Sequence, residues 1–262
     1  MNYFEKLAAR STKAGSLVCV GLDPDARRHS VEDVASYNRA IIEATAPYVA
    51  CYKPNIAFYE QFGLRGLRAL EETLAAIPSD IPVIGDVKRG DIGSTAAAYA
   101  RAMFEEWGFD AITLNPYLGR DSFEPYLQYE GKGCYMVCRT SNPGAADFQY
   151  LETGGERLYE HLARTVTEWS PMVGLVVGAT APDELRRVRE LVPAASLLVP
   201  GVGAQGGEPA EVIAAAGGEP GTIVVSASRS VMYASSGGDF AEAAGRAARQ
   251  LRDELASALS PA

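Results

Sequence analysis

Asp86, Lys88 and Asp91 lie close together in the charged segment D-V-K-R-G-D-I, and their spacing suits electrostatic chemistry. Asp86 and Lys88 are two residues apart and Asp91 follows, while an earlier segment, Y-K-P-N, contributes Lys53. Side chains two apart on a strand point to the same side, so Asp86 and Lys88 are expected to face one site. Charges gathered at a buried site are costly unless they are paired or used. Such an array can stabilise developing charge and transfer a proton.

The same residues also have ordinary structural interpretations. Asp91 precedes a helical pattern that starts near Ile92, and aspartate is a favoured N-cap residue at such a position. Lys88 can equally be a solvated or ion-paired lysine. Both interpretations stay open for a single residue, but two carboxylates and two lysines together favour a functional site.

A glycine-rich segment, L-V-P-G-V-G-A-Q-G-G, precedes a predicted helix that begins near Pro209. Glycines allow backbone N–H groups to approach an anion, and the N-terminus of a helix adds a favourable dipole. Arg229, in the later segment S-A-S-R-S, adds a cation. These features indicate a phosphate site, with a plain glycine-rich turn as the alternative. The glycines are Gly201, Gly203, Gly206 and Gly207.

Short apolar runs recur along the chain, and each is followed by a helical pattern, as in a parallel α/β sheet. Runs such as L-V-C-V and T-I-V-V are hydrophobic throughout, which is typical of strands covered on both faces. Polar residues follow several of these runs, where barrel enzymes carry their chemistry. The predicted strands begin near Leu17, Cys51, Pro82, Ala111, Cys134, Val173, Leu197 and Thr222.

Eight strand and helix pairs favour a closed TIM (β/α)8 barrel over an open doubly wound sheet. An additional N-terminal helix over residues 3–13 is expected to close the bottom of the barrel. Residues 1–262 are expected to form a single domain, since no linker, repeat or low-complexity tract divides them. The other helices are predicted over residues 31–48, 64–76, 92–107, 122–129, 155–169, 182–191, 209–216 and 240–259.

The composition limits the partners of the protein. A net charge of -9 argues against an extended surface for nucleic acid or anionic membranes, although a local cluster can hold one phosphate. No apolar run reaches the ~18–20 residues that span a bilayer, and the charged opening M-N-Y-F-E-K-L is no signal peptide, so a cytoplasmic location is expected.

Four cysteines without zinc-site spacing are predicted to be buried free thiols. They are Cys19, Cys51, Cys134 and Cys138.

The segment D-V-K-R-G-D-I resembles the D-x-K-x-x-D-I motif of the orotidine 5′-phosphate decarboxylase family. The similarity extends along the chain in family order, through V-G-L-D-P-D, Y-K-P-N, L-N-P-Y-L-G, T-S-N-P-G, L-V-P-G-V-G-A-Q-G-G and S-A-S-R-S. The resemblance implies that Lys53, Asp86, Lys88 and Asp91 are the catalytic residues. It also implies a homodimer with shared active sites, in which Asp91 enters the site of the neighbouring subunit.

The resemblance further implies which residues bind the nucleotide substrate. Asp23 is expected to contact the ribose, with help from Thr95 across the dimer, and Ser141 the pyrimidine. Gln205 and Arg229 are expected to hold the phosphate. Family members often have glycine directly before the phosphate arginine. Here Ser228 occupies that place. Whether the backbone approaches the phosphate closely at this position, as glycine would permit, stays open.

The implied reaction is the loss of carbon dioxide from orotidine 5′-phosphate, which leaves negative charge on a ring carbon. Lys88 is expected to stabilise this carbanion and then protonate it. Asp86 would lie beside the substrate carboxylate, while Lys53 and Asp91 hold the array in register. No metal or organic cofactor is expected, since His29 and His161 stand in a polar loop and a helix and the central carboxylates have lysine neighbours.

Two other functions are compatible with parts of the pattern. A related barrel decarboxylase acts on a 3-keto sugar acid phosphate and uses magnesium, but its chemistry requires a carboxylate at the end of strand two, where this chain has Lys53. A catalytically silent phosphate-binding barrel would tolerate the loss of one member of the charged array, whereas all four are present.

Overall fold

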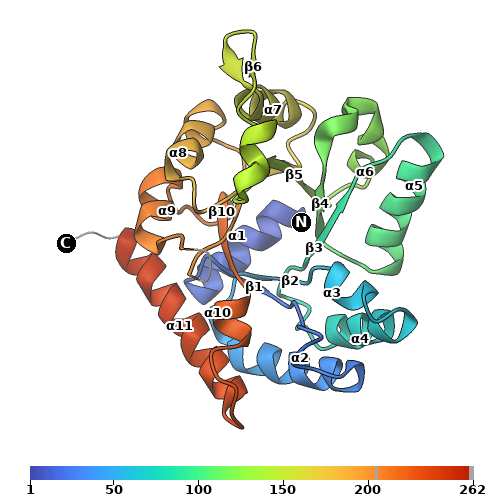
Figure 1. Ribbon diagram of the computed structural model, residues 1–262, viewed down its shortest axis with the longest axis vertical. Coiled ribbons are helices and arrows are strands. Elements are labelled where there is room, and N and C mark those ends of the chain that lie inside the picture. The colour runs from blue at the N-terminus through green and yellow to red at the C-terminus, as the bar shows by residue number, and fades with distance from the viewer. Residues whose placement is uncertain (204–205, 260–262) are drawn as a thin grey trace.

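Eight parallel strands form a ring at the centre of the molecule, with helices outside it (Figure 1). The computed structural model describes residues 1–203 and 206–259. The strands pair in the order β2-β1-β10-β9-β8-β5-β4-β3, and the bridges from Tyr52 to Val83 and from Asn55 to Asp86 join β3 back to β2. The predicted (β/α)8 barrel is confirmed. Its strands are β1 Val18–Gly21, β2 Cys51–Lys53, β3 Ile84–Arg89, β4 Ala111–Leu114, β5 Gly133–Arg139, β8 Val173–Val177, β9 Leu197–Pro200 and β10 Ile223–Ala227.

Helices alternate with these strands along the chain and cover the outer face of the ring. Each predicted helix is present, and the helices that begin with Pro182, Pro209 and Phe240 have the predicted bounds. The helices are α1 Tyr3–Ala14, α2 Val31–Thr45, α3 Ala57–Glu60, α4 Leu64–Ala75, α5 Gly93–Arg101, α6 Glu124–Leu127, α7 Leu158–Thr167, α8 Pro182–Leu191, α9 Pro209–Ala216, α10 Arg229–Met232 and α11 Phe240–Leu259.

The largest departure from the predicted elements precedes α7. The helix predicted from residue 155 begins at Leu158, because the residues before it form a small antiparallel hairpin of β6 Glu152–Thr153 and β7 Glu156–Arg157. Gly154 and Gly155 make its turn with positive φ angles of 61° and 85°, which glycine adopts without strain. The helical pattern of residues 92–107 is likewise divided, since α5 passes into a π-helical turn at Ala102–Glu106.

Helix α1 closes the end of the barrel at which the strands begin, as predicted. Figure 1 shows it crossing the ring of strands. Its Tyr3 and Leu7 are buried among side chains from inside the barrel, including Tyr135 and Val224. The Tyr3 hydroxyl donates to the hydroxyl of Tyr135 at 3.3 Å, so the phenol oxygens are satisfied within the core. Because this end is filled, the open end of the barrel is the one where the strands finish.

The four cysteines are buried and free, which confirms the predicted thiols. Cys19 and Cys51 pair in register on the adjacent strands β1 and β2. Burial raises the pKa of the Cys134 and Cys138 thiols to about 12, so both stay protonated at neutral pH. Within the described ranges no helix combines the length and apolar character needed to cross a membrane.

Gly133 provides a test of the closure at the bottom of the barrel. A Cβ atom at this position would lie 2.4 Å from Cδ1 of Tyr3 and 3.0 Å from Cβ of Ala111. Gly133→Ala should therefore lower the free energy of unfolding by about 1–3 kcal/mol, measured by denaturant titration. Gly238→Ala is the matched control, because nothing lies within 4 Å of its added Cβ, and it should change stability by less than about 0.5 kcal/mol. Equal stability of the two variants would argue against this packing.

Candidate active site

The carboxyl ends of the strands bring the predicted charged residues together. Lys53 is the last residue of β2, and Asp86 and Lys88 are the third and fifth of the six residues of β3. Nζ of Lys53 donates to Oδ2 of Asp86 at 2.8 Å, and Nζ of Lys88 donates to Oδ1 at 2.5 Å. Lys53 and Asp86 are only 6% and 8% exposed, whereas the side chain of Lys88 is 51% exposed. The result is a buried ion pair that holds a third, accessible charge.

Two neutral side chains that the sequence did not single out complete the surroundings of Asp86. Oγ1 of Thr113, on β4, donates to Oδ1 at 3.0 Å, and Nδ2 of Asn55 donates to Oδ2 at 3.4 Å. The backbone N–H of Asn55 also donates to Oδ1 of Asp23 at 3.0 Å. The available signals were the asparagine that ends Y-K-P-N and the one polar residue inside the apolar run A-I-T-L.

The charges at the centre of the site are fixed by their neighbours. Burial alone would raise the pKa of Asp86, but the ammonium groups of Lys53 and Lys88 outweigh it and hold this pKa below its usual range. Burial alone would lower the pKa of Lys53, but the carboxylates of Asp86 and Asp23 outweigh it and raise this pKa. Asp23 differs, because burial raises its pKa against the attraction of Lys53. At neutral pH Asp86 and Lys53 are therefore both charged.

Lys88 reaches Asp86 through an irregular part of β3. Gly85 pairs with Ile112 and Arg89 with Leu114, so the register shifts between them. The backbone of Lys88 has a φ of 43°, and among the described residues no other non-glycine residue has a positive φ. The expected convergence of Asp86 and Lys88 is present, but it arises from a bulge and not from a regular strand.

Two cavities at this end of the barrel meet at the charged array. The larger, of about 590 Å³, is lined by Asp23, Ser228 and Arg229 among others. The smaller, of about 250 Å³, is lined by Lys88, Thr113 and Ser141 among others. Lys53, Asp86 and Pro200 line both cavities. An elongated ligand that occupied both would therefore pass the charged array.

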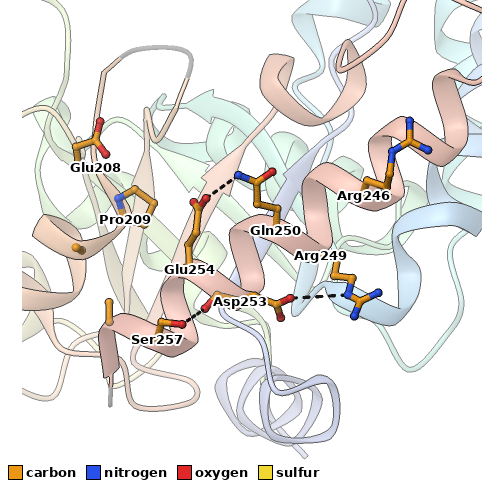
Figure 2. Close-up of a pocket in the computed structure, with 10 residues that line it drawn as sticks. Glu208, Pro209, Arg246, Arg249, Gln250, Asp253, Glu254 and Ser257 are labelled. Carbon is orange, nitrogen blue, oxygen red and sulfur yellow. Dashed lines mark hydrogen bonds and ion pairs between the residues drawn. The ribbon is translucent and has the colours of Figure 1, made fainter. Parts of the chain in front are cut away.

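A larger groove, of about 910 Å³, lies on the outside of the barrel between α11 and the start of α9 (Figure 2). Its polar side chains bind one another. Nε2 of Gln250 donates to Glu254 at 2.8 Å, and Nε of Arg249 lies 3.8 Å from a carboxylate oxygen of Asp253. This outer groove is lined by none of the residues of the charged array. The candidate site is therefore assigned to the end of the barrel where the strands finish.

Asp91 and Thr95 do not line either cavity of their own chain. Asp91 is half-buried and Thr95 is exposed on α5. The N-cap interpretation of Asp91 is wrong, because Ile92 occupies the N-cap position and α5 begins at Gly93. Oδ1 of Asp91 instead accepts from the N–H of Ile92 at 2.8 Å. Gln205 lies outside the described residues.

Ser228, the departure from the family pattern, packs against a glycine. A Cβ atom at Gly21 would lie 2.7 Å from Cβ of Ser228 and 3.0 Å from Oδ2 of Asp23. The missing side chain at Gly21 therefore makes room for the serine beside the carboxylate. Arg229 follows as the exposed first residue of α10 and lines the larger cavity.

The chain is similar to known proteins over nearly its whole length. Residues 16–244 match the orotidine 5′-phosphate decarboxylase / HUMPS family. An orotidine 5′-phosphate decarboxylase from Herpetosiphon aurantiacus is 50% identical over 257 residues, 94% of this chain and 95% of that protein. A Leishmania donovani OMP decarboxylase structure is 37% identical, with a TM-score of 0.86 and coverage of 98% and 99%. A Leishmania donovani UMP synthase structure is 39% identical with a TM-score of 0.88, and the match covers 98% of this chain and 57% of that one.

The buried pair of Lys53 and Asp86 can be tested through stability. Asp86→Asn should lower the free energy of unfolding by about 3–5 kcal/mol, because it leaves Lys53 charged and buried. The lowered pKa of Asp86 means that its stabilising charge is fully present above the ordinary carboxyl pKa and is lost as the pH falls towards the folded-state value. Denaturation at pH 7 therefore measures the full loss. The double variant Asp86→Asn/Lys53→Met should recover most of it, and an Asp86→Asn protein as stable as wild type would contradict the pairing.

Proposed function

The chain belongs to the orotidine 5′-phosphate decarboxylase family, and on this premise we propose how its charged array performs the reaction. The enzyme is a carbon–carbon lyase that converts orotidine 5′-phosphate to uridine 5′-phosphate in pyrimidine synthesis. One observation supports the proposed mechanism above the others. The buried Lys53–Asp86 pair holds the ammonium group of Lys88 at the wall of a cavity, where it remains half exposed.

Lys88 is the proposed partner of the developing carbanion. When the bond between the ring carbon and the carboxylate breaks, carbon dioxide leaves and the electron pair stays on the ring carbon. An ammonium group ~4 Å away stabilises this charge by about 4 kcal/mol at an effective dielectric near 20. Nζ of Lys88 then transfers a proton to the same carbon, which gives the product.

Asp86 and Lys53 keep the array charged and in place. The low pKa of Asp86 keeps it ionised, so its carboxylate attracts the side chain of Lys88 and would lie beside the carboxylate of the substrate. Repulsion between the two carboxylates would ease as carbon dioxide leaves. Lys53 balances the charge of Asp86 from the buried side, at 2.8 Å.

The remaining binding residues are proposed to orient the nucleotide along the two cavities. Ser141 lines the smaller cavity with Lys88, which suits the pyrimidine. Asp23 and Arg229 line the larger one, which suits the ribose and the phosphate. Gln205 is proposed as a second phosphate contact. Because the phosphate is remote from the reacting carbon, its binding energy can serve to exclude water and to position the ring.

The proposed homodimer would complete each site with residues of the other chain. Ile92, directly after Asp91, is an exposed apolar residue, as are Tyr117 and Leu118 after β4. The segments that carry these residues start side by side, since the N–H of Asn115, just after β4, donates to the carbonyl of Arg89, the last residue of β3, at 2.9 Å. Exposed apolar side chains in neighbouring segments support a protein interface here. A single domain over residues 1–262, a cytoplasmic location and independence from metals or cofactors stay predictions.

Lys88→Ala tests the mechanism directly. Turnover of orotidine 5′-phosphate, followed by ultraviolet absorbance, should fall by more than about 1,000-fold, because both the stabilising charge and the proton are lost. Uridine 5′-phosphate should still bind, since its ribose and phosphate contacts are unchanged. Lys13→Ala, which removes an exposed lysine from α1, is the control and should retain wild-type turnover. Substantial turnover by a folded Lys88→Ala enzyme would refute the assignment.

Subunit mixing tests whether Asp91 serves the partner's site. Lys88→Ala and Asp91→Ala dimers should each be inactive. After exchange, a mixed dimer would have one intact site, made from Lys88 of one chain and Asp91 of the other. Random exchange of equal amounts makes about half the dimers mixed, so about a quarter of the wild-type site activity should return.

Lys88→Ala mixed with Asp86→Asn is the control for this experiment. Both of these residues come from the same chain's β3, so no mixed dimer gains an intact site and activity should stay absent. If exchange is demonstrated and the Asp91→Ala mixture also stays inactive, Asp91 does not act across the dimer.

A further inference from the structure

The backbone of Lys88 is held in a conformation that L-amino acids rarely adopt. Its φ of 43° lies in the left-handed region, which is costly for a residue with a side chain. Such a conformation persists only where the surrounding structure imposes it. The side chain of Lys88 is itself half exposed, so its own packing does little to impose it. The interactions that hold this bulge therefore determine where the ammonium group lies.

The bulge leaves β3 without a regular ladder at the residues that carry the charges. Gly85 pairs with Ile112 and Arg89 with Leu114. Three residues of β3, numbers 86–88, therefore stand opposite the single residue Thr113 of β4. The N–H of Asp86 donates to the carbonyl of Pro54 at 3.0 Å, so the N–H groups of Val87 and Lys88 are the ones that need a partner. N–H groups left unpaired in a buried site are unfavourable.

The hydroxyl of Thr113 supplies the missing interactions. Its Oγ1 accepts from the backbone N–H of Val87 and of Lys88, both at 3.0 Å, and donates to Oδ1 of Asp86 at 3.0 Å. A hydroxyl has one donor and two acceptor sites, so all its capacity is used on consecutive residues of β3. Thr113 is only 1% exposed, so water is poorly placed to replace it.

We propose that Thr113 is a positioning residue for the decarboxylation, whose hydroxyl fixes the β3 bulge so that the ammonium group of Lys88 and the carboxylate of Asp86 meet at the reacting carbon. The inference rests on the proposed role of Lys88. Thr113 acts through two backbone amides and one carboxylate and transfers no proton to the substrate. A hydroxyl is required at this position, and the methyl group of threonine is not.

The test compares Thr113→Val, which keeps the shape and removes the hydroxyl, with Thr113→Ser, which keeps the hydroxyl. Thr113→Val should lower kcat about 100-fold, because a displacement of catalytic groups by about 1 Å has effects of this size. Its KM for orotidine 5′-phosphate should stay within about 3-fold, since the Thr113 hydroxyl binds Val87, Lys88 and Asp86 and neither Asp23 nor Arg229, the proposed ribose and phosphate contacts. Thr113→Ser should retain kcat within about 3-fold of wild type.

Amide hydrogen exchange supplies a measurement that does not depend on activity. In Thr113→Val the N–H groups of Val87 and Lys88 should lose protection, while those of Val224 and Val225 on β10 should not change. If Thr113→Val does not fold, Thr113→Ala is measured in its place with the same expected split between kcat and KM.

Wild-type kcat in the variants that lack the hydroxyl would overturn the proposal, as would an equal loss of kcat in Thr113→Ser. Faster exchange over the whole barrel would also overturn it, because it would mean a general structural role. These outcomes differ from a failure of the proposed function, which would appear as residual turnover in Lys88→Ala whatever the Thr113 variants do.

Discussion

The carboxylate of Asp86 is the group on which the rest of the site depends. Each of its oxygens binds a different lysine, Lys53 from the buried side and Lys88 from the side of the cavity. Two ammonium groups this close would repel each other, and a buried lysine without a partner would tend to lose its proton. The central carboxylate removes both problems. It also holds the half-exposed ammonium group of Lys88 in a fixed position at the wall of the cavity.

The barrel separates the requirement for stability from the requirement for chemistry. At the end where the strands begin, α1 and the aromatic side chains of Tyr3 and Tyr135 fill the interior. At the end where the strands finish, charged residues replace apolar ones and two cavities remain. The buried charges of the candidate site therefore lie at one end of the barrel, and the packing of the other end offsets their cost. This division is common among (β/α)8 enzymes.

The site also depends on departures from regular geometry. The bulge in β3 brings the ammonium group of Lys88 onto the carboxylate of Asp86, which stands two residues earlier on the same strand. The absence of a side chain at Gly21 makes room for Ser228 next to Asp23. Both features place a polar group where a regular strand with ordinary side chains could not. They are local irregularities that a rigid surrounding barrel can impose.

The sequence by itself determined the barrel, the order of its elements and three charged residues that meet in the site, namely Lys53, Asp86 and Lys88. Strands covered on both faces read as unbroken apolar runs, and helices such as α8 and α9 begin at proline, so local pattern was sufficient for them. The hairpin before α7 was missed because its two-residue strands are too short to show a period. The N-cap interpretation of Asp91 failed because the helix starts one residue later than its pattern suggests.

Only the tertiary structure decided how the charges are held. Thr113 and Asn55 bind Asp86 from positions 27 and 31 residues away along the chain, in segments that become its neighbours only when the chain folds. The bulge at Lys88 likewise depends on pairing between β3 and β4 and leaves no local signature in the sequence. Residue types can indicate which groups are able to do chemistry. Their distances are set by contacts between segments that the chain keeps far apart until it folds.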